Sequence, residues 1–84
     1  MDERLARNEL SVRMKERAML KREYDTLKAE ADRLEYEYYC TYESDEKLLT
    51  EWLETLEKAD KVRNDIRANV TRQNELRCFV RMVG

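Results

Sequence analysis

The sequence contains no histidine and no proline, and its one glycine is the last residue, Gly84. Without histidine the chain lacks the side chain best suited to proton transfer near neutral pH. Its many carboxylates recur at spacings typical of the solvent-facing side of a helix. We therefore predict no catalytic residues, and a protein that is not an enzyme.

Large aromatic residues are also scarce, since the chain of 84 residues has one Phe, one Trp and five Tyr. A domain of this size buries only about 60% of its unfolded surface, so a thick core cannot form. We therefore expect a partner to contribute to the stability of the fold. Charged residues make up 43% of the chain, and helix-breaking residues are missing from its interior. This composition is typical of long, solvated helices, and we predict one all-α domain over residues 1–84.

Long apolar runs are absent as well, and none of the sequence could cross a bilayer. The first residues, Met1 to Arg7, are charged where a signal peptide would be apolar. We expect a soluble, intracellular protein with no membrane partner.

What the sequence does contain is a helical seam, a line of apolar residues at alternating steps of four and three. Its first half consists of Leu20, Tyr24, Leu27, Ala31, Leu34 and Tyr38. Counted back from Leu20, the seam continues through Arg17, Arg13, Leu10 and Ala6, where two arginines interrupt the apolar line. The same count passes through a polar gap at Thr41 and Asp45 before it becomes apolar again. Its second half consists of Leu48, Trp52, Thr55, Ala59, Val62, Ile66, Asn69, Gln73, Leu76 and Val80.

Two architectures fit this seam: an antiparallel hairpin, or one unbroken helix of about 120 Å that pairs in parallel with a copy of itself. In the parallel dimer Arg13, Arg17 and Asp45 would each meet their own copy, which is costly. In the hairpin, seam partners have numbers that sum to 86, so Leu10 meets Leu76 and Leu20 meets Ile66.

The polar layers also match in the hairpin, since Arg13 meets Gln73 and Arg17 meets Asn69, whose amide oxygens can accept from a guanidinium. A flanking pair, Glu16 with Arg72, should attract. The sequence therefore favours a two-helix antiparallel coiled-coil hairpin.

Helix propensity falls between Cys40 and Asp45, where the chain is expected to bend near residues 41–45. We predict helices over about 2–41 and 45–81, with Ser44 as the N-cap of the second helix. Asparagine and threonine residues also lower the helix propensity around Asn69, so the sequence leaves open a break in the second helix there.

The hairpin would gather charge of one sign at each end. Residues 1–22 carry seven bases and four acids, and residues 61–84 carry six bases and two acids, which gives +7 at the end with the termini. Residues 23–60 carry thirteen acids and four bases, which gives −9 around the turn. Cys40 and Cys78 would lie at opposite ends, about 45 Å apart, so they can form neither a disulfide nor a metal site.

Spare apolar residues lie outside the seam at both ends, and a lone hairpin would leave them exposed. They are Tyr36, Tyr39, Tyr42, Leu49, Leu53 and Leu56 near the turn, and Leu5, Val12 and Met19 near the termini. We interpret them as partner-binding residues of a coiled-coil interaction module or adaptor. Its partner would be a second copy, giving a homodimeric four-helix bundle, or another protein. We expect no cofactor, metal or small molecule.

Two alternatives use the charged ends instead. The basic end could bind nucleic acid through Arg4, Arg7, Arg77 and Arg81, although no recognised nucleic-acid-binding motif is present. The acidic turn end could instead occupy the basic groove of a protein that handles nucleic acids, and so inhibit it.

Overall fold

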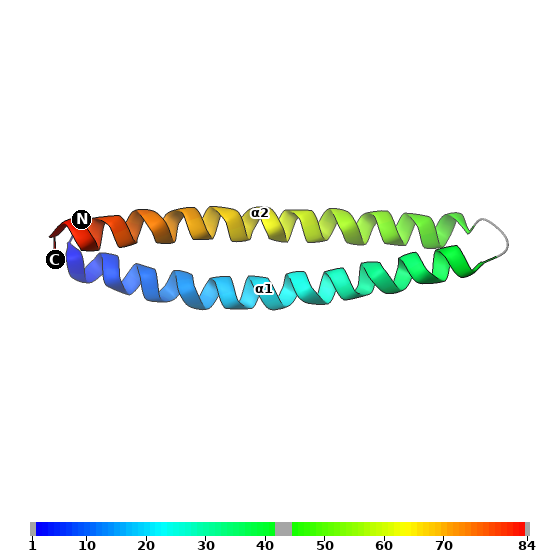
Figure 1. The fold of residues 1–84 in the computed structure, drawn as a ribbon, viewed down its shortest axis with the longest axis horizontal. Helices are drawn as coiled ribbons and strands as arrows, with labels where there is room; N and C mark the ends of the chain where they lie inside the picture. Colours follow the sequence, from blue (N-terminus) through cyan, green and yellow to red (C-terminus); the bar gives the residue numbers. More distant parts are fainter. Residues whose placement is uncertain (1, 42–44, 84) are drawn as a thin grey trace.

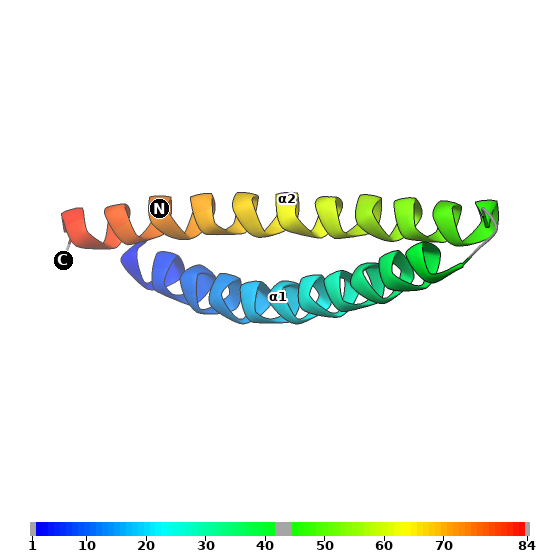
Figure 2. The same cartoon turned by 45° about the vertical axis from the view of Figure 1, so that its right-hand side comes forward.

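The computed structural model describes residues 2–41 and 45–83, which form two long helices packed side by side in opposite directions (Figures 1 and 2). Helix α1 spans Glu3–Cys40 and helix α2 spans Glu46–Val83, 38 residues each. The chain measures 62 × 14 × 14 Å along its principal axes. Both termini lie at the same end (Figure 1). The predicted all-α antiparallel hairpin is confirmed.

A thin core runs along the seam between the helices. Six apolar residues are buried in it: Ala6, Ala31, Leu34, Ala59, Val62 and Leu76. Most other seam residues are half-buried, among them Leu20, Tyr24, Leu27, Trp52 and Ile66. Because charged residues occupy the other faces, neither helix is apolar enough along its described length to cross a membrane.

A polar layer interrupts this core near the termini. Asn69 and Gln73 are 2% and 3% exposed, and the Gln73 amide donates to the Asn69 Oδ1 atom over 2.6 Å. The same amide donates to the backbone carbonyl of Arg13 over 3.4 Å, which confirms that Arg13 and Gln73 lie opposite each other. The predicted bonds from the arginine side chains were wrong, because the Arg13 guanidinium pairs with Glu16 and Arg17 is exposed.

One ion pair links the two helices across the edge of the seam. Arg72 contacts Glu9, with 2.8 Å between Nε and Oε2, and also contacts Glu75 one turn along its own helix. The predicted pairing of Arg72 with Glu16 was therefore wrong. Seven-residue steps place Glu9 and Glu16 on the same edge of α1, and Arg72 contacts the one nearer the N-terminus.

The helix ends have specific caps. The Asp2 side chain accepts from the Arg4 N–H at the start of α1. The Asp45 side chain accepts from the N–H groups of Lys47 and Leu48, so Asp45 caps α2. Ser44, the predicted cap, lies outside the described residues.

The helix boundaries differ by one or two residues from the predicted ranges 2–41 and 45–81. The break considered near Asn69 is absent, since α2 continues to Val83. Burial of Asn69 against α1 outweighs its weak helix propensity.

Candidate interaction surface

Apolar side chains from both helices are exposed near the turn. We call Tyr36, Tyr39, Leu49, Leu53 and Leu56 the turn-end surface. Tyr36 is 72% exposed, Tyr39 70% and Leu53 54%, whereas Leu49 and Leu56 are half-buried. Tyr42, which was predicted to join this set, lies outside the described residues. Helical spacing places the three leucines on one side of α2, at steps of three and four.

Aromatic stacking positions part of this surface. The Tyr39 ring lies 5.5 Å from the Tyr38 ring and 6.2 Å from the Trp52 ring, edge to face in both cases. Tyr38 also lies 6.0 Å from Trp52. Edge-to-face contacts of this kind stabilise aromatic pairs beyond the area they bury. Tyr39 is therefore held in place although most of it is exposed, which suits a residue that binds a partner without losing much side-chain entropy.

A second apolar set follows α1 near the termini, at steps of seven. Leu5, Val12 and Met19, here called the terminal-end stripe, are 61%, 60% and 70% exposed. Their seven-residue spacing puts them on a side of α1 that does not face α2. The structure therefore leaves them exposed, but at the opposite end of the hairpin from the turn-end surface.

Sequence reasoning missed two apolar clefts near the termini. One of about 410 Å³ lies on α1 and is lined by Arg7, Leu10, Ser11, Met14 and Lys15. The other, of about 550 Å³, lies on α2 and is lined by Thr71, Asn74, Glu75, Cys78, Phe79 and Met82. Met14 is 52% exposed and Met82 85%. Neither methionine belongs to the seam or to the terminal-end stripe. Their apolar character outside these two sets was the only sequence signal that could have predicted the clefts.

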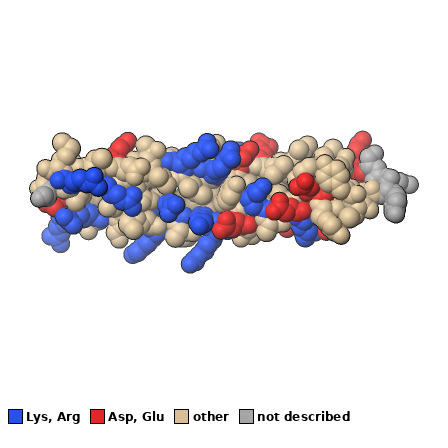
Figure 3. Space-filling view, in the orientation of Figure 1, with Lys and Arg blue, Asp and Glu red and all other residues tan. Residues whose placement is uncertain are grey.

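Charge of opposite sign gathers at the two ends of the molecule. In Figure 3, Lys and Arg cover the half nearer the termini and the middle, whereas most Asp and Glu lie toward the turn. This arrangement follows from the charge blocks of the sequence once the chain folds back on itself. A potential partner would therefore meet a basic end near the termini and an acidic end near the turn.

The four arginines considered for nucleic-acid contacts lie exposed at the basic end. Two of them already have partners within the chain. Arg7 pairs with Glu3, and Arg77 donates to the side chains of Gln73 and Asn74. These partners reduce the charge that Arg7 presents and restrict the orientation of Arg77.

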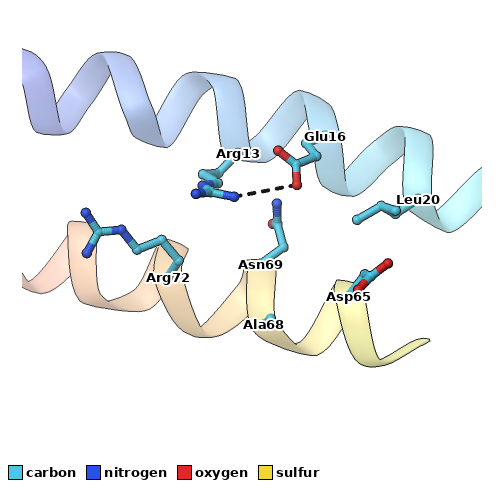
Figure 4. Close-up of a pocket in the computed structure, with 7 residues that line it drawn as sticks. All are labelled: Arg13, Glu16, Leu20, Asp65, Ala68, Asn69 and Arg72. Carbon is cyan, nitrogen blue, oxygen red and sulfur yellow. Dashed lines mark ion pairs between the residues drawn. The ribbon is translucent and has the colours of Figure 1, made fainter. Parts of the chain in front are cut away.

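A polar cleft of about 400 Å³ opens beside the buried polar layer (Figure 4). It is lined by Arg13, Glu16, Leu20, Asp65, Ala68, Asn69 and Arg72. The Asn69 amide points across the cleft toward α1, where Arg13 and Glu16 pair over 3.5 Å. Among the described residues its Nδ2 atom has no hydrogen-bond partner, although it is buried. The cleft combines two bases and two acids, so it selects for neither charge.

Two arginines have a raised pKa. The hydrogen bonds that Arg33 donates to Glu30 and Glu37 raise its pKa, and those that Arg72 donates to Glu9 and Glu75 raise its pKa. A raised folded-state pKa contributes stability that is lost only when the pH rises through that pKa, far above the physiological range. Both arginines therefore stay charged at every physiological pH.

In residues 2–41 and 45–83 no group of three or more Cys, Asp or Glu side chains is arranged to hold a metal ion. Cys40 and Cys78 are both free and exposed.

Comparison with known proteins identifies no relative: no protein-family model, curated protein or solved structure matches the chain.

Proposed function

We propose that this protein is a non-catalytic interaction module that acts by assembly, through its turn-end surface, with the helices of a second copy or of another protein. The observation that carries this proposal is the exposure of Tyr36, Tyr39 and Leu53 in a chain whose seam is already occupied. Isolated exposed apolar residues are common, but clustered aromatic and leucine side chains within a charged rim are typical of an interface.

The exposed area of the hairpin supports the same proposal. A compact monomer of 10.2 kDa exposes about 5,300 Å². The hairpin exposes 6637 Å². The excess is larger than the roughly 800 Å² that each partner buries in an interface of standard size. Assembly through an interface of standard size would remove more than half of this excess.

Replacing Leu53 with Ser tests the proposal with little risk to the fold, because Leu53 is 54% exposed and lies outside the seam. Burying a fully exposed leucine contributes roughly 1.5 to 3 kcal/mol, and Leu53 has about half of its surface left to bury, so we expect assembly to weaken about four- to tenfold. The triple replacement of Leu49, Leu53 and Leu56 with Ser should abolish assembly while circular dichroism still reports helix. Sedimentation equilibrium measures self-assembly, and affinity capture measures other partners.

The matched control replaces Leu5, Val12 and Met19 with Ser, which removes a similar apolar area at the other end. This control variant should keep the self-association, or the binding of other proteins, that the Leu53→Ser variant loses. A wild type that is monomeric, and that captures the same proteins as the triple variant, would contradict the proposal.

A further inference from the structure

We infer that the occupant of the turn-end surface is a second copy of this chain, antiparallel to the first, so that the acidic end of each copy lies beside the basic end of the other. This inference rests on the proposed function and adds the identity and direction of the partner. The product is a four-helix bundle with two-fold symmetry, in which the same surface of both copies forms the interface.

Charge selects the direction. In a parallel pair of hairpins the two ends of +7 would lie side by side, and so would the two ends of −9. In an antiparallel pair each end meets charge of opposite sign. Like charges held together along an interface repel and opposite ones attract, so the antiparallel pair is favoured.

The register within the hairpin shows which residues would meet. The contact of Gln73 with Arg13 places residue n of α1 beside residue 86 − n of α2. Helix α1 is centred between residues 21 and 22, and α2 between residues 64 and 65, which is the same level. A two-fold axis that passes through this level, perpendicular to the long axis of the hairpin, places α2 of one copy against α2 of the other. It also places α1 against α1.

The edge used is the one away from the Arg72–Glu9 ion pair. Steps of seven place Leu49, Leu56 and Val70 together on that edge of α2. All three are half-buried in the hairpin and available for further burial. When the two copies overlap along their whole length, Leu56 of one copy lies between Val70 and Arg77 of the other. Leu53 and Leu49 then cover the aliphatic stem of Arg77.

On α1 the same overlap places residue n of one copy beside residue 43 − n of the other, so Tyr39 lies level with residue 4. The cleft of about 410 Å³ begins one turn further along α1, at Arg7. The Tyr39 ring would reach the guanidinium of Arg7, which would lie against the ring face, an arrangement that stabilises aromatic interfaces. The overlap thus places a turn-end residue of one copy at the edge of a cleft of the other.

Charged residues at the rim also meet their complements. Glu35 of one copy falls beside Arg7 of the other, which already pairs with Glu3 of its own copy, and Glu46 falls beside Arg81; these four side chains of the two pairs are exposed in the hairpin. Symmetry repeats each pair, so four such contacts form. The centre of the face carries Lys21 and Arg63, which are exposed and can extend into solvent; Arg63 already pairs with Asp60. The interface therefore consists of two equal end regions around a wet centre.

The native cysteines provide the test, because both are exposed and free and neither lies on the proposed face. Two single-cysteine proteins, Cys78→Ala and Cys40→Ala, would each carry one spin label for pulsed dipolar distance measurement. At 1.5 Å per residue, labels on Cys40 of both copies should lie about 55 Å apart in the antiparallel bundle. A mixture of the two labelled proteins should add a short distance of about 20 to 30 Å between Cys40 of one copy and Cys78 of the other.

Each alternative result overturns the inference. A parallel dimer would bring the two Cys40 labels within about 20 to 30 Å and give no short distance between Cys40 and Cys78. This result would leave assembly itself in place. A protein that stays monomeric at the concentrations of the distance measurement would exclude a second copy as the occupant. Capture by the turn-end surface of another protein, lost in Leu53→Ser, would then decide whether the proposed function stands.

Discussion

Asn69 and Gln73 are the polar residues buried in the seam, and their hydrogen bonds form a chain along α2. Arg77 donates to the Oε1 atom of Gln73 over 3.0 Å, and Gln73 donates in turn to Asn69. Gln73 also reaches the carbonyl of Arg13, so the chain ties α2 to one level of α1. Of these bonds only the one from Gln73 to the Arg13 carbonyl crosses to α1, so a shift of register would break that bond and leave the bonds within α2 in place. A buried polar layer of this kind lowers stability but favours one register over its neighbours.

Gln73→Leu should destabilise the hairpin, since it removes the partner of the Asn69 oxygen and leaves that amide buried with no bond. A buried polar group without a partner costs about 1 to 3 kcal/mol. The double replacement of Asn69 and Gln73 with Leu removes both polar groups and should restore or exceed the stability of the wild type. Urea unfolding, followed by circular dichroism at one protein concentration, measures both. A double variant that is less stable than Gln73→Leu would show that the polar layer stabilises the fold.

At the scale of the helix, the two elements have equal length but different caps. Asp45 accepts two N–H bonds at the start of α2, where the chain reverses direction. Asp2 accepts one at the start of α1, near the free end of the chain. Thr41 ends α1, and its hydroxyl donates to the Tyr38 carbonyl over 2.7 Å. The hairpin thus stops one helix and starts the next with side-chain bonds, without a glycine in its turn.

Asp45→Ala should lower the free energy of unfolding by about 1 kcal/mol, the usual cost of losing an N-cap. Asp2→Ala is the matched control and should cost less, because Asp2 accepts one backbone N–H bond and Asp45 accepts two. Thermal unfolding by circular dichroism compares the two. Equal losses would mean that the turn is no more constrained than the chain terminus.

At the scale of the whole molecule, an elongated shape and separated charge occur together. The chain is 62 Å long and 14 Å wide, so its basic and acidic ends lie several Debye lengths apart at physiological salt. Each end therefore acts on a partner almost independently. Because the ends are separated, the charge pattern determines the orientation in which a partner approaches. The apolar residues determine the affinity with which the partner is bound.

Association of the two copies should weaken with salt. Raising the salt from about 0.1 M to about 1 M shortens the Debye length from about 10 Å to about 3 Å. Four exposed ion pairs of up to about 1 kcal/mol each would then be screened, and we expect the dimer Kd to rise by about tenfold or more. Sedimentation equilibrium at both salt concentrations measures this. A Kd that is unchanged or lower at 1 M would indicate that apolar contact alone holds the dimer.

The hairpin could be predicted from the order of residues alone, because a seam is a local periodicity and its partners can be matched by counting. The match of Leu10 with Leu76, and of Arg13 with Gln73, needed only the assumption that the chain folds back once. The exposure of Leu5, Val12, Met19 and Leu53 followed from the same count, since residues out of phase with the seam face away from it.

The contacts between polar side chains could not be predicted in this way and are known only from the folded chain. The sequence indicated that Arg13 and Arg17 would bind the amides opposite them, but a long guanidinium can reach several acceptors. Arg13 instead contacts Glu16, and Arg72 contacts Glu9. The clefts that Met14 and Met82 help to line depend on how neighbouring side chains fill space, which periodicity does not describe. Backbone register is determined by many weak contacts that repeat along the chain, whereas an ion pair or a cleft depends on a few side chains with several positions of similar energy.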